Sequence, residues 1–145
     1  MDALTEVDTL VEAALLEIAL DAVGGEAWFL FDCRGALQIE EANTAVVVVQ
    51  DVTELRWTTT VRHGPFWHAV MSWEPFAGSD GLTISAGFAP DADLHVVGSG
   101  GAFYVGNIPG GDGPPPDLTS AGKEEIRLGL ASWSSEIELV GTSYR

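Results

Sequence analysis

Hydrophobic residues near the N-terminus recur at steps of three and four positions. The series consists of Leu4, Val7, Val11, Leu15, Ile18 and Ala22. Such spacing places the side chains on one face of an α-helix. Asp2 or Thr5 can cap the start of this helix, and Gly24 and Gly25 can end it. The pattern therefore predicts one long helix over residues 5–22.

After Gly25 the apolar residues alternate with polar ones, and β-branched and aromatic side chains dominate. This pattern is typical of β-strands. It predicts strands at 26–32, 36–41, 44–50, 54–62, 66–73, 82–88, 93–98 and 102–106. The runs WFLF and VVVV are apolar on both faces, as in central strands that the helix covers on one side. Because the breaks between strands are short, successive strands are expected to pair as an antiparallel meander.

These elements together predict an α+β fold. The N-terminal helix packs on a twisted antiparallel β-sheet, which can curl into a barrel-like shape. The length of 145 residues fits a single domain, 1–145. Residues 107–122 hold four of the seven prolines and predict an exposed Pro/Gly-rich loop. In the tail, two strands that turn at 132–135 are favoured, and a short helix within 123–131 is the alternative.

Residues 54–62 and 66–73 predict a β-hairpin. If Val61 pairs with Trp67, then Trp57 lies opposite Met71, and the remaining inward positions match as well. The apolar pairs place Trp67, Met71 and Trp73 on the core face. A five-residue loop from 62 to 66 keeps this register and avoids a left-handed backbone at Pro65.

The tip of this hairpin is the predicted partner-binding surface. Arg62, His63 and Phe66 lie at the tip, and His68 lies beside them on the outer face. Exposed aromatic and arginine side chains often dominate protein interfaces. His63 and His68 are five residues apart, a spacing that brings them to one face of neither a helix nor a strand. We therefore predict no metal site and no cofactor.

The charge is the extreme feature of the composition. Twenty-two acidic residues face six basic ones, which gives a net charge of −16, and Lys123 is the single lysine. A surface of this sign repels phosphate and anionic lipid, and it attracts basic partners. The sequence thus argues against direct nucleic-acid or membrane binding. A salt-rich cytoplasm or a solubilising surface would explain the same charge without a partner.

Targeting and redox features favour the cytoplasm. The N-terminus lacks the basic start and apolar core of an export signal, and no apolar stretch is long enough to span a bilayer. Cys33 is the only cysteine, so an internal disulfide is excluded. Arg34 next to it favours the thiolate, but no neighbouring base completes a nucleophilic site. A structural cysteine is the preferred interpretation.

Two functional hypotheses follow. The first is a small acidic binding protein of a bacterial cytoplasm, in concrete form an immunity or antitoxin-type inhibitor of a basic partner such as a toxin or enzyme. The absence of a complete catalytic motif favours this hypothesis over an enzyme. The alternative is a small-molecule-binding β-barrel or a cyclase-type enzyme. Its apolar pocket would be lined by Trp28, Trp57, Trp67 and Trp73.

Overall fold

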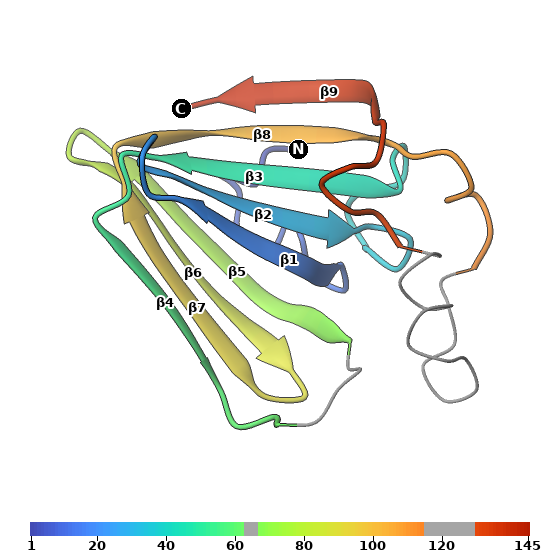
Figure 1. Ribbon diagram of the computed structural model, residues 1–145, viewed down its shortest axis with the longest axis horizontal. Helices are drawn as coiled ribbons and strands as arrows, with labels where there is room; N and C mark the ends of the chain where they lie inside the picture. The colour runs from blue at the N-terminus through green and yellow to red at the C-terminus, as the bar shows by residue number, and fades with distance from the viewer. Residues whose placement is uncertain (63–66, 115–129) are drawn as a thin grey trace.

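Alternating and β-branched segments build one antiparallel sheet, whose spatial order is β4-β7-β6-β5-β1-β2-β3-β8-β9 (Figure 1). The computed structural model describes residues 1–62, 67–114 and 130–145. The strands are β1 (Ala14–Asp21), β2 (Glu26–Asp32), β3 (Thr44–Gln50), β4 (Glu54–Thr59), β5 (His68–Gly78), β6 (Gly81–Ala89), β7 (Ala92–Gly98), β8 (Gly100–Asn107) and β9 (Glu138–Tyr144). No helix occurs in the described residues. The α+β prediction is therefore wrong, and the protein is all-β.

The sheet is folded into two halves that diverge from a common corner (Figure 1). One half contains β4, β7, β6 and β5, and the other contains β1, β2, β3, β8 and β9. At the corner the N–H of Ser99 donates to the carbonyl of Gln50, and the N–H of Thr53 donates to that of Val97. The edge strands β4 and β9 do not pair with each other, so the sheet stays open. The expected barrel-like closure is wrong.

The predicted helix over residues 5–22 is replaced by turns followed by strand β1. Asp8 and Glu12 adopt positive φ angles of 60° and 67°, a conformation that ends a helix. Leu15 in β1 faces the main core, whereas Leu16 packs on the opposite side of the sheet. A strand covered on both faces loses its two-residue period, and its leucines, alanines and glutamates then resemble a helix.

The N-terminal segment, residues 1–13, fills the space between the two halves of the sheet. Leu4 and Leu10 are fully buried, and Leu4 lies beside Gly101 of β8. The indole Nε1–H of Trp73 donates to the carbonyl of Ala3 at 2.7 Å. The ring of Trp73 also meets Phe31 edge to face at 5.6 Å. This irregular segment thus covers the core, as the N-terminal helix was expected to do.

Strands β2 and β3 are buried on both faces, as their continuous apolar runs predicted. Phe29 and Val47 face the main core between the two halves. Leu30 and Val48 face a smaller cluster on the other side, where Ala131 and Ile137 pack against them. The cover on this second side therefore includes the chain that precedes β9.

The predicted hairpin of residues 54–62 and 66–73 is wrong in its pairing. β4 pairs with β7, and β5 pairs with β6 and, over two residues, with β1. A register shift between Val70 and Ser72 leaves Met71 exposed, whereas Trp73 is fully buried. The apolar pattern therefore predicted correctly that Trp73 faces the core. It did not identify the strand that pairs with β5, because several strands of this chain have similar apolar faces.

Two further strand predictions fail or are only partly met. Residues 36–41 form an irregular loop between β2 and β3, in which Ile39 alone is buried among mostly exposed neighbours. In the tail, β9 forms at Glu138–Tyr144, whereas 130–137 is irregular. Residues 123–129 of the expected strand or helix within 123–131, and residues 115–122 of the predicted loop at 107–122, lie outside the described residues.

Candidate partner-binding surface

Of the four residues predicted to contact a partner, the structure describes Arg62 and His68. Arg62 follows β4 and is exposed. His63 and Phe66 lie outside the described residues. His68 begins β5 and is half-buried, and its ring meets Trp57 edge to face at 5.2 Å. The partner-binding tip therefore stays a prediction.

His68 is in an apolar environment. Within the described residues its Nδ1 atom is buried and has no hydrogen-bond partner. Burial lowers the pKa of His68, because the charged imidazolium loses its hydration. The side chain thus packs against Trp57 of β4 while part of its surface stays exposed, and its role as a partner contact stays a prediction.

The four tryptophans predicted to line one pocket lie in different places. Trp73 is fully buried, and Trp57 packs between His68 and Phe88. Trp67 precedes β5 and is half-buried. Trp28 lies on the outer face of β2 against Trp133, with ring centroids 6.2 Å apart.

Trp28 does contribute to an apolar depression of about 210 Å³, together with Val46, Tyr104, Ile137 and Leu139. This volume is below the range typical of small-molecule pockets. The structure thus offers no common pocket for the four tryptophans within its described residues.

A different surface is assembled where the chain leaves β2 and β8. Asn43 and Asn107 connect the loop before β3 to the end of β8. The backbone N–H of Asn43 donates to Oδ1 of Asn107 at 3.0 Å, and the N–H of Ile108 donates to Oδ1 of Asn43 at 3.0 Å. A Cβ on Gly111 would overlap the Asn43 amide, so glycine permits this close approach. These contacts hold two loops in a fixed relation.

A buried ion pair lies beneath the same loops. The guanidinium of Arg34 bonds to the carboxylate of Asp32, and both side chains are less than a tenth exposed. Cys33, between them, is also buried. Desolvation, followed by the negative charges of Asp32 and Glu41, raises the pKa of Cys33 far above its ordinary value. Cys33 is therefore a structural thiol, as the sequence suggested.

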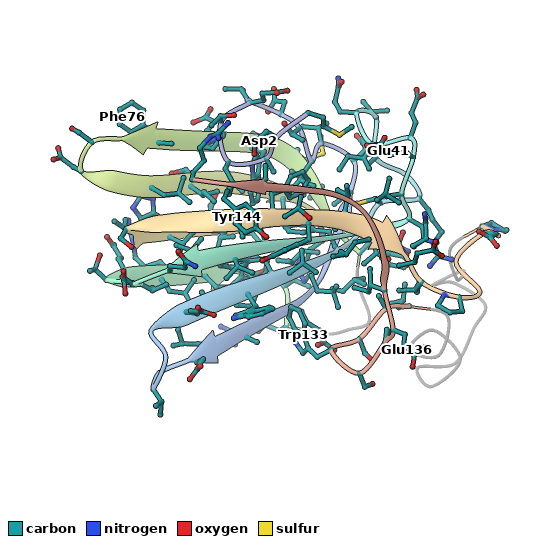
Figure 2. All side chains as sticks on the ribbon, turned by 90° about the horizontal axis from the view of Figure 1, so that it is seen from above. Asp2, Glu41, Phe76, Trp133, Glu136 and Tyr144 are labelled. Atoms are coloured by element: carbon teal, nitrogen blue, oxygen red, sulfur yellow. The ribbon has the colours of Figure 1, made fainter. Side chains whose placement is uncertain are left out.

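Five exposed carboxylates surround this scaffold, and we refer to them as the acidic end. They are Glu40, Glu41, Asp112, Glu136 and Glu138. They line two depressions of about 560 and 510 Å³, which adjoin because Asn107 and Asp112 belong to both. Figure 2 shows Glu41 and Glu136 at the same end of the molecule, away from Phe76.

Among the described residues, three arginines pair with carboxylates that lie outside the acidic end. Three of the four arginines in the described ranges already pair within the chain. Arg34 pairs with Asp32 below the acidic end, and Arg56 pairs with Glu54 at 2.7 Å on the opposite half of the sheet. The third pair joins Arg145 to Asp2 at 2.9 Å. None of these three ion pairs uses a carboxylate of the acidic end.

Sequence reasoning missed the acidic end because it is assembled from three separate segments. Glu40 and Glu41, like Glu136 and Glu138, were visible as acidic pairs but resembled ordinary solvated residues. The signal that joins them is the pairing of β3 with β8, which the meander prediction did not contain. In the sequence this junction is marked by two asparagines: Asn43 lies immediately before β3, and Asn107 is the last residue of β8.

Comparison with known proteins adds no functional assignment. No protein-family model, curated protein or solved structure matches the chain. Within the described ranges, no three His, Cys, Asp or Glu side chains are grouped so that they could hold a metal ion. Nor does that part of the chain contain a helix of the length and apolar character needed to cross a membrane.

Proposed function

We propose that this protein is an acidic binding protein that captures a basic protein partner at the acidic end. In its concrete form it is an immunity or antitoxin-type inhibitor of a cationic toxin or enzyme. The observation that carries the proposal is the arrangement of five exposed carboxylates around two adjoining depressions. The net charge of −16 supports it from the composition.

The geometry suits a partner with protruding lysine or arginine side chains. A carboxylate on the rim of a depression attracts a cation and can accept its hydrogen bonds as water leaves. Because Asn43 and Asn107 already fix the loops, less conformational freedom is lost on binding. The same field repels nucleic acid, so inhibition would act by covering the partner's cationic surface.

The test captures a partner from the native host with immobilised protein. An acidic-end variant carries neutral isosteres at the five positions: Glu40→Gln, Glu41→Gln, Asp112→Asn, Glu136→Gln and Glu138→Gln. A control variant loses the same five charges elsewhere: Glu26→Gln, Glu74→Gln, Asp80→Asn, Asp91→Asn and Asp93→Asn. Both variants have the same net charge, so a difference between them reports location rather than total charge.

We expect one basic protein to be retained by the wild type and by the control variant, released by salt, and lost from the acidic-end variant. The retained protein is identified by mass spectrometry, purified, and assayed for an activity that the wild type inhibits. Equal retention by both variants would contradict the assigned surface. Retention of a single acidic or neutral protein would contradict the basic partner itself.

A further inference from the structure

A polar groove lies on the outer face of the half-sheet formed by β4, β7, β6 and β5. Its volume is about 350 Å³, and its lining includes Arg56, Ser72, Ser85, Asp93 and His95. The opposite face of these strands carries core residues. The groove is therefore a shallow surface feature on a rigid support, separate from the acidic end.

Ser85 and His95 are direct cross-strand neighbours in the groove, one on β6 and the other on β7. The Oγ atom of Ser85 lies 3.0 Å from Nδ1 of His95. On the other side of the ring, Nε2 of His95 lies 3.7 Å from Oε2 of Glu54. Oε1 of Glu54 is held by Arg56 at 2.7 Å. A serine, a histidine and a carboxylate thus follow one another across three strands.

This order is the arrangement that activates a serine nucleophile. A histidine within hydrogen-bond distance accepts the hydroxyl proton, and a carboxylate behind it favours the imidazolium that forms. The contact between Nε2 and Glu54 is longer than a hydrogen bond, but such contacts often shorten when substrate binds. Local sequence spacing gives no sign of this site, because the two partners of His95 lie ten and forty-one positions away from it.

We propose that Ser85, His95 and Glu54 form a hydrolytic site for small esters. Ser85 acts as the nucleophile, His95 as the general base and acid, and Glu54 as the positioning residue. Arg56, in the same groove, is the cation that can stabilise the developing oxyanion. This activity goes beyond the proposed partner binding and does not depend on it.

The reaction balances with water as the only co-reactant. Oγ of Ser85 attacks the acyl carbon, its proton moves to Nδ1 of His95, and the ester C–O bond breaks. The leaving alcohol takes that proton, and the acyl group remains on Ser85. Water then attacks the acyl carbon and gives a proton to His95. The bond to Oγ breaks, Ser85 recovers the proton, and a carboxylic acid leaves.

Neighbouring charges restrict the substrate. Glu74 and Asp93 also line the groove, so anionic esters are disfavoured. The small volume and the hydroxyl-rich lining favour a short acyl group over a long apolar chain. The structure thus points to uncharged or cationic short-chain esters.

Ser72 provides a matched control in the same groove. Its Oγ accepts the backbone N–H of Gly87 at 3.1 Å. Ser72 faces Gly87 in the strand register, whereas Ser85 faces His95. If exposure in the groove alone made a serine reactive, Ser72 and Ser85 would react alike. If the contact with His95 is required, only Ser85 reacts.

The test uses the full chain with 4-nitrophenyl acetate as substrate and diisopropyl fluorophosphate as the covalent probe. Peptide mass spectrometry is expected to place the phosphoryl adduct on Ser85 and not on Ser72. Ser85→Ala and His95→Gln should lower the rate at least about 100-fold, whereas in Ser72→Ala the adduct should still form on Ser85. Glu54→Gln should lower kcat about tenfold and leave KM unchanged, as its positioning role requires, and Glu54→Asp should restore part of the loss.

The labelling arm needs no variant, so a folding defect cannot obscure the result. A wild-type protein that carries no adduct on Ser85 would overturn the proposal, and so would hydrolysis that survives Ser85→Ala. An acidic-end variant with unchanged esterase activity would separate this site from partner binding. A wild-type protein that retains no basic partner but is still labelled at Ser85 would overturn the proposed function alone.

Discussion

Replacement of Asp2 tests how the N-terminal segment is held against β9. Asp2 is nearly buried, and its carboxylate meets four partners. Oδ1 accepts the backbone N–H of Leu4 at 2.9 Å and the hydroxyl of Ser143 at 2.8 Å. Oδ2 accepts the hydroxyl of Thr5 at 3.1 Å and pairs with Arg145 at 2.9 Å. Asp2→Ala removes all four contacts.

The magnitude follows from the contacts that are lost. A hydrogen bond to a charged group contributes roughly 1.5–3 kcal/mol, and a buried donor left unpaired costs a further share. Because the side chain of Arg145 is about half exposed, its ion pair adds little to this sum, and we expect a loss of about 2–4 kcal/mol in the free energy of unfolding. For a chain of this length the loss corresponds to a fall of roughly 4–16 °C in Tm.

Urea unfolding followed by tryptophan fluorescence measures the effect, with Asp80→Ala as the control. Asp80 is exposed in the turn between β5 and β6, so its replacement should cost less than about 0.5 kcal/mol. In a double-mutant cycle, Asp2→Ala and Ser143→Ala should couple by more than about 0.5 kcal/mol. If the two substitutions have additive effects, or if Asp2→Ala is as stable as the control, the contacts of Asp2 do not hold the N-terminal segment against β9.

The pH dependence gives an independent check on the same residue. Burial raises the pKa of Asp2 and is the largest single influence on it. The hydrogen bonds from Leu4, Ser143 and Thr5 and the charge of Arg145 together outweigh burial and hold the pKa below its ordinary value. The unfolded chain therefore takes up this proton first as the pH falls. The stabilisation is complete above about pH 5 and is lost as the pH falls through the folded pKa, a loss that Asp2→Asn should abolish.

Three shorter predictions concern Cys33, His68 and Gly98. Because burial raises the pKa of Cys33, iodoacetamide at mildly alkaline pH should alkylate it only after unfolding; rapid alkylation of the folded protein would contradict this. Because burial lowers the pKa of His68, stability should fall as the pH drops below roughly 6.5, and His68→Phe should remove that part of the slope while keeping a ring against Trp57. A Cβ on Gly98 would overlap the carbonyl of Gln50 and lie 2.5 Å from Cγ1 of Val49, so Gly98→Ala should cost about 1–3 kcal/mol in urea unfolding. Gly113→Ala is the control, since no described atom lies within 4 Å of its added Cβ, and equal costs would show that the corner is not tightly packed.

The sequence predicted individual strands better than their arrangement. Runs of β-branched and aromatic residues located β2 and β3, and alternation located β6 and β7, because these signals depend on neighbouring residues. β1 was mistaken for a helix, since its leucines pack on both faces and its two-residue period disappears. Strand order was out of reach, because many apolar faces of similar shape are compatible with one another.

The candidate sites illustrate the same limit. Nothing within a short stretch of sequence relates Glu54, Ser85 and His95, and nothing relates Glu41 to Glu136. Each set is assembled by pairing between strands that are distant in the chain. Composition, which needs no pairing, indicated an acidic surface but not its location.

The association rate between the protein and its captured partner tests the central claim most directly. Stopped-flow measurements would compare the wild type, the acidic-end variant and the control variant at low and high salt. If the acidic end attracts a basic partner, the wild-type and control rates should fall at least about tenfold between roughly 0.05 and 0.5 M salt. The acidic-end variant should associate slowly at both concentrations. Rates that are the same for all three proteins and insensitive to salt would contradict the account.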